Sequence, residues 1–202
     1  MVKKELVVGI DEVGRGCLAG PVVVCAALTM RGKRFSNKNL GILKDSKKIP
    51  VRLREEWFLH LKKIEVIFAI SRVSPAVIDR VNISRAANIA AERALKKLLL
   101  LAGLQEGDID VFLDGGLYLG SKEKSLSRAA TVIKGDEKIK VIAAASIAAK
   151  VTRDRFMVRL SKKYPGYGLE VHKGYGTKAH IRAIKRQGLS DAHRRSFTKK
   201  II

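Results

Sequence analysis

Two adjacent carboxylates, Asp11 and Glu12, stand between an apolar segment and a glycine-rich turn. The apolar segment (residues 7–10) is typical of a buried strand, and the turn carries one arginine between two glycines. Successive strand residues point to opposite faces of a sheet, so these two side chains can converge only where the strand twists or bulges at its end. Acids at such a place are suited to metal binding or proton transfer, because the loop leaves room for a ligand.

Two further acids follow apolar segments in the same way. Asp114 ends the run that begins at residue 109 and precedes two glycines, and Asp136 follows the run 130–133 in a Lys-Gly-Asp sequence. An acid beside a glycine is common turn chemistry, so one such pair would carry little weight. Three predicted strands that end in this way, in a chain poor in acids, indicate a shared site.

Clustered carboxylates favour one kind of chemistry in particular. Mg²⁺ is a hard cation that proteins hold with a few acids, waters and substrate phosphates. Two such ions ~3.5–4 Å apart can activate a water and stabilise the leaving oxygen of an in-line displacement. The metal also offsets the repulsion between the acids and an incoming phosphate. The four acids therefore predict metal-assisted phosphodiester chemistry.

The charge of the chain points to a polyanionic partner. The 202 residues include 41 Lys and Arg against 19 Asp and Glu, which gives a formal net charge of +22. A solvated, lysine-rich surface would explain many of these charges, but not so lopsided a balance. Nucleic acid is the expected partner, ahead of an anionic membrane. The length fits one domain, and a hydrophobic fraction of 47% excludes wholesale disorder.

The apolar runs and the cysteines predict where in the cell the protein is located. The longest runs fall short of the ~20 residues that a membrane span needs, and acids at positions 5, 11 and 12 break any signal-peptide core. Cys17 and Cys25 form no CxxC pair, so they are expected to be small buried hydrophobes in a reducing compartment. We expect a cytoplasmic protein with no membrane partner.

The periodicity of the chain predicts an α/β protein. Apolar runs rich in β-branched residues predict strands at 5–12, 21–28, 65–70, 109–114 and 130–133. Apolar stripes and capping residues predict helices after Pro50, after Ser74-Pro75, and over 85–102, 139–162 and 177–186. Residues 31–49 and 117–128 are expected to be loops.

Two alternative sites are weighed and disfavoured. Gly14-x-Gly16-x-x-Ala19 matches the loose dinucleotide fingerprint, but that motif works only when the turn opens a helix, and here a proline and a valine run follow. A zinc site could be imagined from three histidines, but no cysteine supports it and the spacing fits no common pattern; these are His172, His180 and His193.

Two loops have the composition of nucleic-acid contacts. The charged run 44–48 is either a solvated stretch ahead of a helix or a phosphate-binding loop. The loop 164–177 interleaves glycines, cations and three tyrosines, and cations can hold phosphates while rings stack on sugars or bases. Tyr164 and Tyr167 are also plausible structural residues, whereas Tyr175 stands between a lysine and two glycines.

Taken in order, these motifs resemble those of the ribonuclease HII family over nearly the whole chain. The matching segments are Gly9–Gly16 with Gly20-Pro21, Lys44–Lys48, Leu113–Gly115, Lys134–Asp136 with Ala143–Ile147, Lys150–Arg155 and His172–Thr177. The tail segment 188–193 departs from the more usual form in that family.

The resemblance implies an RNase H-like fold, in which helices flank a mixed central β-sheet, with a helical C-terminal region. A single catalytic domain would cover residues 1–202, with a basic substrate-binding region at about 164–202. It further implies a monomer that uses Mg²⁺ or Mn²⁺, two ions with substrate, to cut RNA in RNA–DNA hybrids and to cut 5′ of ribonucleotides embedded in duplex DNA. The products would be a 3′-hydroxyl and a 5′-phosphate.

The resemblance also assigns roles residue by residue. The catalytic and metal-binding carboxylates would be Asp11, Glu12, Asp114 and Asp136. The turn that senses the ribose 2′-hydroxyl, which tells RNA from DNA, would be Gly14, Arg15 and Gly16. Tyr175 would stack on the deoxyribose that follows the ribonucleotide, and Lys47 would contact a phosphate.

Two points remain open from the sequence. Asp154 lies in a prominent motif, but it is inside a predicted helix between arginines, so we predict ion pairs and a structural role. A basic nucleic-acid-binding protein without catalysis is the main alternative function. Both functions predict salt-sensitive binding, so only cleavage separates them.

Overall fold

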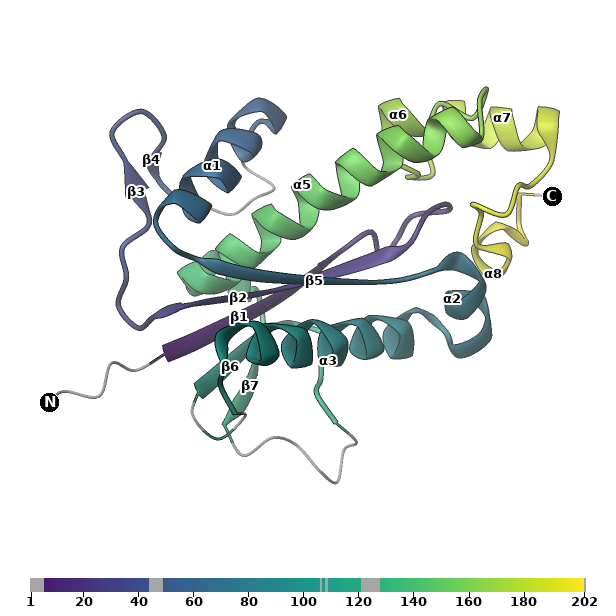
Figure 1. Ribbon diagram of the computed structural model, residues 1–202. Coiled ribbons are helices and arrows are strands. Elements are labelled where there is room, and N and C mark those ends of the chain that lie inside the picture. The colour runs from purple at the N-terminus through teal and green to yellow at the C-terminus, as the bar shows by residue number, and fades with distance from the viewer. Residues whose placement is uncertain (1–5, 44–48, 106, 108, 121–127, 202) are drawn as a thin grey trace, which may run out of the picture.

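The protein is built on a five-stranded mixed sheet (Figure 1). The computed structural model describes residues 6–43, 49–105, 107, 109–120 and 128–201. The strand order is β5-β2-β1-β6-β7, with bounds β1 Leu6–Val13, β2 Val22–Met30, β5 Ile67–Val73, β6 Ile109–Asp114 and β7 Ala129–Val132.

Strand directions bring two predicted strand ends together. Strands β1, β2 and β5 pair antiparallel, whereas β1 pairs parallel with β6, and β6 pairs parallel with β7. In the β1–β6 register Ile10 is opposite Leu113. The residues that follow these two, both acids, therefore emerge at the same edge of the sheet.

Helices cover both faces of this sheet (Figure 1). Their bounds are α1 Val51–Lys63, α2 Pro75–Val81, α3 Ile83–Ala102, α4 Gly135–Lys138, α5 Lys140–Lys163, α6 Leu169–His172, α7 Lys178–Gln187 and α8 Arg195–Thr198. One face packs on α3, and the other packs on α5 with α1 outside it. The helical C-terminal region that we expected is formed by α6, α7 and α8.

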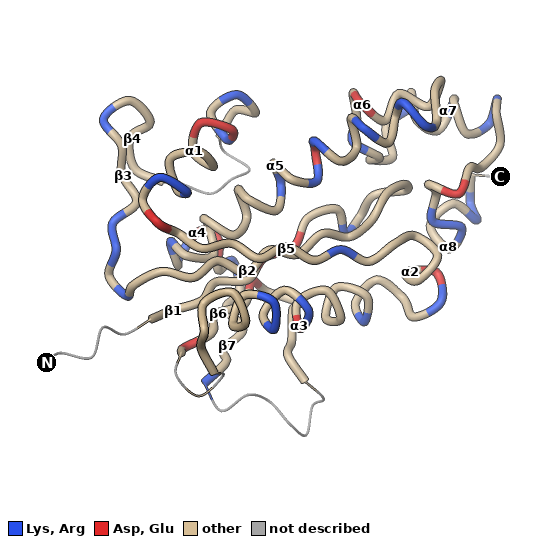
Figure 2. Tube along the Cα trace, viewed as in Figure 1, with Lys and Arg blue, Asp and Glu red and all other residues tan. Residues whose placement is uncertain are grey.

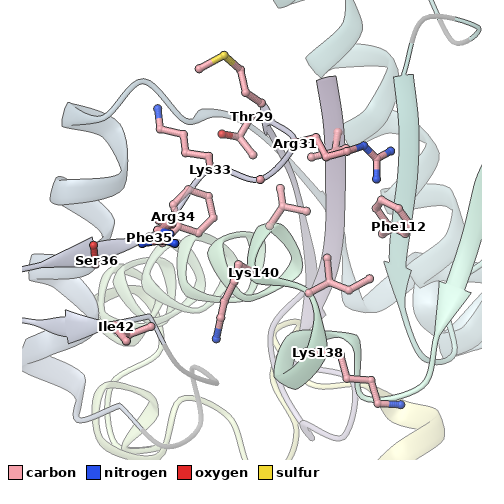
Figure 3. Close-up of a pocket in the computed structure, with 15 residues that line it drawn as sticks. Thr29, Arg31, Lys33, Arg34, Phe35, Ser36, Ile42, Phe112, Lys138 and Lys140 are labelled. Atoms are coloured by element: carbon pink, nitrogen blue, oxygen red, sulfur yellow. The ribbon is translucent and has the colours of Figure 1, made fainter. Parts of the chain in front are cut away.

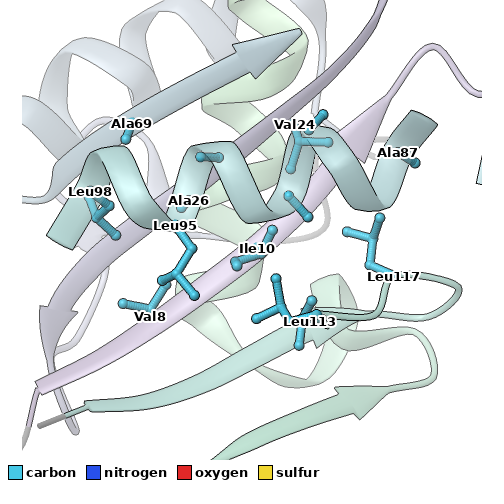
Figure 4. Packing of buried hydrophobic residues seen from close by; sticks show 14 of the residues in the cluster. Val8, Ile10, Val24, Ala26, Ala69, Ala87, Leu95, Leu98, Leu113 and Leu117 are labelled. Atoms are coloured by element: carbon cyan, nitrogen blue, oxygen red, sulfur yellow. The ribbon is translucent and has the colours of Figure 1, made fainter. Parts of the chain in front are cut away.

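Successive side chains of β1 point to opposite faces of the sheet. Val8 and Ile10 point into the cluster under α3, where they meet Leu95 and Leu98 (Figure 4). The intervening positions point toward α5. A Cβ at Gly9 would lie 2.5 Å from the backbone nitrogen of Ile142. Only glycine therefore lets α5 approach the central strand closely enough to reach its acids.

A third apolar cluster attaches the C-terminal region to the rest. It joins the C-terminal end of α5 to α6 and α7, and to the segments around residues 19 and 192. Its buried members are Ala19, Met157, Tyr167, Leu169, Ala183, Ile184 and Ala192. An antiparallel bridge between Ala19 and His193 adds backbone pairing. The loop that follows β1 is thus packed against residues from the far end of the chain.

Most predicted elements are confirmed, and three predictions need correction. The region 31–49, expected to be loop, contains a small hairpin of β3 (Ser36–Asn37) and β4 (Gly41–Ile42). The loop 164–177 contains the helix α6. The strand expected to lead into Asp136 ends at Val132, and Lys134 adopts a positive φ of 55° that starts α4, so this acid lies on a short helix.

Candidate active site

Three of the predicted carboxylates meet at the edge of the sheet. Oxygens of Asp11, Glu12 and Asp114 all lie within 4.8 Å of one another. The parallel register of β1 and β6 brings Asp11 and Asp114 together. Ile10 and Leu113 are opposite each other in the two strands, and one of the acids follows each of them. The two strands are about a hundred residues apart in the sequence, yet their ends are neighbours.

Asp11 is buried and surrounded by negative charge. Its Oδ1 accepts a hydrogen bond of 2.8 Å from the backbone N–H of Glu12, and the Ser146 hydroxyl of α5 donates to the same carboxylate. Burial, then the charges of Glu12 and Asp114, raise the pKa of Asp11 well above its usual value. A bound cation would relieve this repulsion.

Glu12 offers an oxygen without a donor. Its Oε1 lies 3.5 Å from Nη1 of Arg15. Its Oε2 is buried and has no hydrogen-bond partner among the described residues. Burial raises the pKa of Glu12, an effect that Arg15 opposes. An unsatisfied buried acceptor is costly, and a carboxylate oxygen is the ligand that hard divalent cations prefer. The acids therefore fit a divalent metal.

Asp136 is not a member of this three-carboxylate group. It is buried on α4, directly after Gly135, whose backbone N–H donates to Oδ1 of Asp114 at 2.7 Å. The fourth predicted acid is therefore tied through its neighbour to one of the other three. Its role as a ligand stays a prediction.

The predicted sensing turn lies beside the acids. Gly14 has a φ of 88°, and a Cβ there would lie 2.2 Å from Nε of Arg153, whereas a Cβ at Gly16 would meet nothing within 4 Å. The Arg15 guanidinium donates to the Gly116 carbonyl at 3.3 Å, to the Ser84 hydroxyl at 3.0 Å and toward Glu12. Space on one side of the turn is thus filled by protein, and on the other side it is open.

Two buried arginines, which the sequence analysis missed, hold this turn in place. Arg194 donates to the carbonyls of Gly14, Arg15 and Gly20 at 2.7, 2.9 and 3.0 Å. Arg153 donates to the carbonyls of Ala19, Pro21 and Lys173 at 3.1, 3.1 and 2.8 Å. We call this pair the arginine clamp. It fixes the loop from residue 14 to residue 21 and ties it to the loop that carries Tyr175.

The ion pairs predicted around Asp154 are correct for two of three residues. Asp154 accepts from Lys150 at 2.8 Å, and Arg155 pairs with Glu55. Arg153 points inward to backbone carbonyls, so the ion pair predicted for it is wrong. The position of Arg153 on the helix indicated its burial, because it continues a buried stripe of Ser146, Ala149 and Met157.

Tyr175 lines the same cavity as the acids. Its side chain is partly exposed, and its ring lies 5.6 Å from Nζ of Lys150. Desolvation raises the pKa of its phenol. The cavity measures about 240 Å³ and is lined by Asp11, Glu12, Val13, Gly14, Arg15, Gly16, Arg54, Asp114, Ser146, Lys150 and Tyr175. Arg54, Ser146 and Lys150 had no predicted site role from the sequence, and Lys47 lies outside the described residues.

The three histidines form a network of hydrogen bonds and ring stacking behind Tyr175. His180 bonds through Nδ1 to the Tyr175 carbonyl at 2.9 Å and through Nε2 to Nε2 of His193 at 3.1 Å. The ring of His172 stacks on that of His180 with centroids 4.2 Å apart. The network links the tyrosine loop to α7 and to the segment that bears Arg194.

Charge gathers in the C-terminal region. Residues 164–202 contain nine Lys and Arg against two acids, and Figure 2 shows cations of this region on α7 and α8, beyond the end of α5. Among the described helices, none has the length and apolar character that crossing a membrane requires.

The chain is similar to known proteins in sequence and in fold. The family model described as "Ribonuclease HII" matches residues 8–200. A ribonuclease HII of Fusobacterium nucleatum is 43% identical over 198 residues, covering 97% of this chain and 87% of the relative. One of Alkaliphilus metalliredigens is 38% identical, with 98% and 92% covered. The crystal structure of the ribonuclease H2 from Pyrococcus horikoshii has a TM-score of 0.71 at 26% identity, covering 97% of this chain and 96% of that one.

Proposed function

Because the chain belongs to the ribonuclease HII family, we propose that it cuts RNA in RNA–DNA hybrids and also cuts 5′ of single ribonucleotides embedded in duplex DNA. Membership of the family makes it a type 2 RNase H, an endonuclease and a hydrolase. The observation that carries the proposal is the cavity that holds three convergent carboxylates, a clamped glycine turn and Tyr175.

The proposed cofactor is Mg²⁺ or Mn²⁺, held by Asp11, Glu12 and Asp114, with Asp136 as the fourth ligand. The unpartnered Oε2 of Glu12 and the raised pKa of Asp11 support this assignment. When bound, two such ions would supply activation of the attacking water and stabilisation of the leaving oxygen. The products would then be a 3′-hydroxyl and a 5′-phosphate.

The chain's own residues supply position and selectivity. Ser146 and the backbone of β1 hold Asp11 in one orientation before substrate arrives. The arginine clamp sets the shape of the turn formed by Gly14, Arg15 and Gly16, which would touch the ribose 2′-hydroxyl. Tyr175 would stack on the next deoxyribose. Preorganised groups of this kind lose little freedom when the substrate binds.

The remaining sequence predictions join this proposal. Residues 164–202 would hold phosphates with their excess of cations, and Lys47 would contact a further phosphate. One catalytic domain over residues 1–202, a monomeric state and a cytoplasmic location complete the expectation.

The test is a DNA duplex with one ribonucleotide, incubated with protein and Mg²⁺ or Mn²⁺, and mapped for the position of the cut. We expect cleavage on the 5′ side of the ribonucleotide and none in an all-DNA duplex. Asp11→Asn should abolish cleavage while duplex binding survives, and Glu170→Gln, an exposed acid outside the cavity, should cut normally. Metal-dependent cutting that persists undiminished in Asp11→Asn would refute the catalytic assignment, and binding without any cutting would favour the non-catalytic alternative.

A further inference from the structure

A second, larger cavity lies at the other end of the sheet (Figure 3). It measures about 670 Å³ and is formed where β1 begins, where β2 runs into the β3–β4 hairpin, and where α4 meets α5. Among the residues that the structure describes, none lines both this cavity and the carboxylate cavity. Val7 lines it, and Asp11 lies four residues further along the same face of β1, about 13 Å away.

The walls of this cavity are apolar and partly aromatic. Val7, Ile139 and Val141 contribute aliphatic surface. Figure 3 places Phe35 and Phe112 on opposite sides of the hollow. A volume of this size falls within the range of small-molecule sites, which are lined mainly by apolar and aromatic side chains.

The rim is cationic. Within the described part of the chain, five basic residues and no Asp or Glu line the cavity; the five are Arg31, Lys33, Arg34, Lys138 and Lys140. Asp110, outside the cavity, pairs with Arg31. Lys33 donates to the Ile64 carbonyl, and Lys140 donates to the Leu43 carbonyl at 2.9 Å. Carbonyl partners hold these ammonium groups in place without cancelling their charge.

We propose that this cavity is a second, non-catalytic binding site for one unpaired nucleotide of a nucleic-acid strand. The phosphate would lie against the cationic rim, and the base would stack on Phe112, whose side chain is partly exposed, whereas Phe35 is only 3% exposed and closes the opposite wall. Rings bind unpaired bases by stacking, and cations follow the backbone. A paired base cannot enter a hollow of this kind because its faces are covered by its neighbours in the stack. The occupant is therefore a single-stranded segment and not the duplex at the cleavage site.

Binding is tested with a single-stranded thymidine hexanucleotide and with thymidine monophosphate, without divalent metal so that no cutting occurs. Amide resonances of residues that line the cavity, among them Gly32, Phe112 and Val141, should shift on titration. Arg34→Glu with Lys138→Glu, both exposed, should weaken hexanucleotide binding at least tenfold and reduce the salt slope by about 1.4, since each single-strand phosphate contact contributes ~0.7. The matched control is Lys96→Glu with Lys97→Glu, which makes the same charge change on exposed positions of α3.

A second variant tests the ring without altering charge. Phe112→Leu keeps an apolar side chain and removes the stacking surface, so hexanucleotide affinity should fall about five- to 150-fold. Its thermal melting, measured in parallel, must show that it is folded at the titration temperature.

Several results would overturn the proposal. These are amide shifts confined to the carboxylate cavity, equal losses in the rim and control variants, and equal affinity for inorganic phosphate or for a hexaglutamate peptide. Cleavage of the duplex with one ribonucleotide is measured on the same samples. That assay reports on the proposed catalytic function alone, so failure of one idea leaves the other standing.

Discussion

Replacing Arg194 by alanine should destabilise the protein more than any surface substitution. The side chain is fully buried and donates three hydrogen bonds of 2.7–3.0 Å to the carbonyls of Gly14, Arg15 and Gly20. A hydrogen bond from a charged donor contributes ~1.5–3 kcal/mol. Desolvation opposes this gain, since burial lowers the pKa of Arg194 to about 10.

The net cost of Arg194→Ala is therefore about 3–5 kcal/mol, because three backbone carbonyls each lose a donor at ~1–3 kcal/mol, and removal of a buried charge offsets part of this loss. For a chain of this length each kcal/mol lowers Tm by about 2–4 °C, so Tm should fall by roughly 6–20 °C. Arg194→Lys keeps the charge, but an ammonium group cannot reproduce a fork that spans three carbonyls. Arg194→Lys should therefore lose about half as much stability as Arg194→Ala. It should also cut more slowly than the wild type at a temperature where it is folded.

Thermal and urea unfolding, followed by circular dichroism, measure these differences. The control is Arg195→Ala, which removes the same charge from the exposed neighbouring residue and should change stability by less than about 0.5 kcal/mol. Cleavage is measured at 25 °C with one ribonucleotide in a duplex. If Arg194→Ala has the same Tm as Arg195→Ala, or if Arg194→Lys cuts at the wild-type rate, the clamp does not hold the turn.

Three further predictions concern the acids, the histidines and the turn. Asp11→Asn should stabilise the metal-free protein by about 0.5–2 kcal/mol, because it removes a buried charge whose pKa is raised; Mg²⁺ should raise Tm in the wild type and much less in this variant. Burial lowers the pKa of His180 from 6.5 to about 4, so the unfolded chain binds the proton more tightly and stability should fall by roughly 3 kcal/mol as pH drops from about 6.5 to 4. His180→Gln should flatten melting curves over that window, and His60→Gln should not. Gly14→Ala should lower Tm by several degrees, because its Cβ would meet a buried guanidinium at 2.2 Å, whereas Gly16→Ala should melt normally and lose cleavage; equal melting of the two would contradict this account.

The sequence was sufficient to identify the acids, but not to bring them together. Apolar runs that end in Asp-Glu, Asp-Gly and Gly-Asp mark strand ends and turns by local chemistry alone. That Asp11 and Asp114 are neighbours depends on β6 pairing with β1, a contact across about a hundred residues that no local pattern specifies. Asp136 was misplaced for a local reason, since an αL residue at Lys134 starts a helix where the pattern suggested a continuing strand end.

The arginine clamp was hidden because charge is a poor guide to burial. Arginines are mostly exposed, so a sequence with 41 basic residues suggests that Arg153 and Arg194 face solvent. The acceptors that make their burial possible are carbonyls of a glycine-rich loop, and the sequence does not show which way a carbonyl points. Arg153 at least continued a buried stripe on α5, whereas Arg194 lies in a segment with no periodicity.

The clamp changes what the basic C-terminal region must be doing. The family resemblance and the excess of cations predicted that residues 164–202 bind the substrate, yet Arg194 and the histidine network also fix the turn beside the acids and the loop of Tyr175. Deleting the region would remove both contributions at once, so a loss of cleavage would not show that phosphate contacts had been lost. Exposed cations of α7 separate the two: Lys185→Ala with Arg186→Ala should weaken duplex binding and reduce its salt dependence, while Tm and the rate of cutting at saturating substrate stay near those of the wild type. If this double variant instead lowers the rate of cutting at saturating substrate, the C-terminal region contributes to catalysis through its surface charges and not only through the clamp.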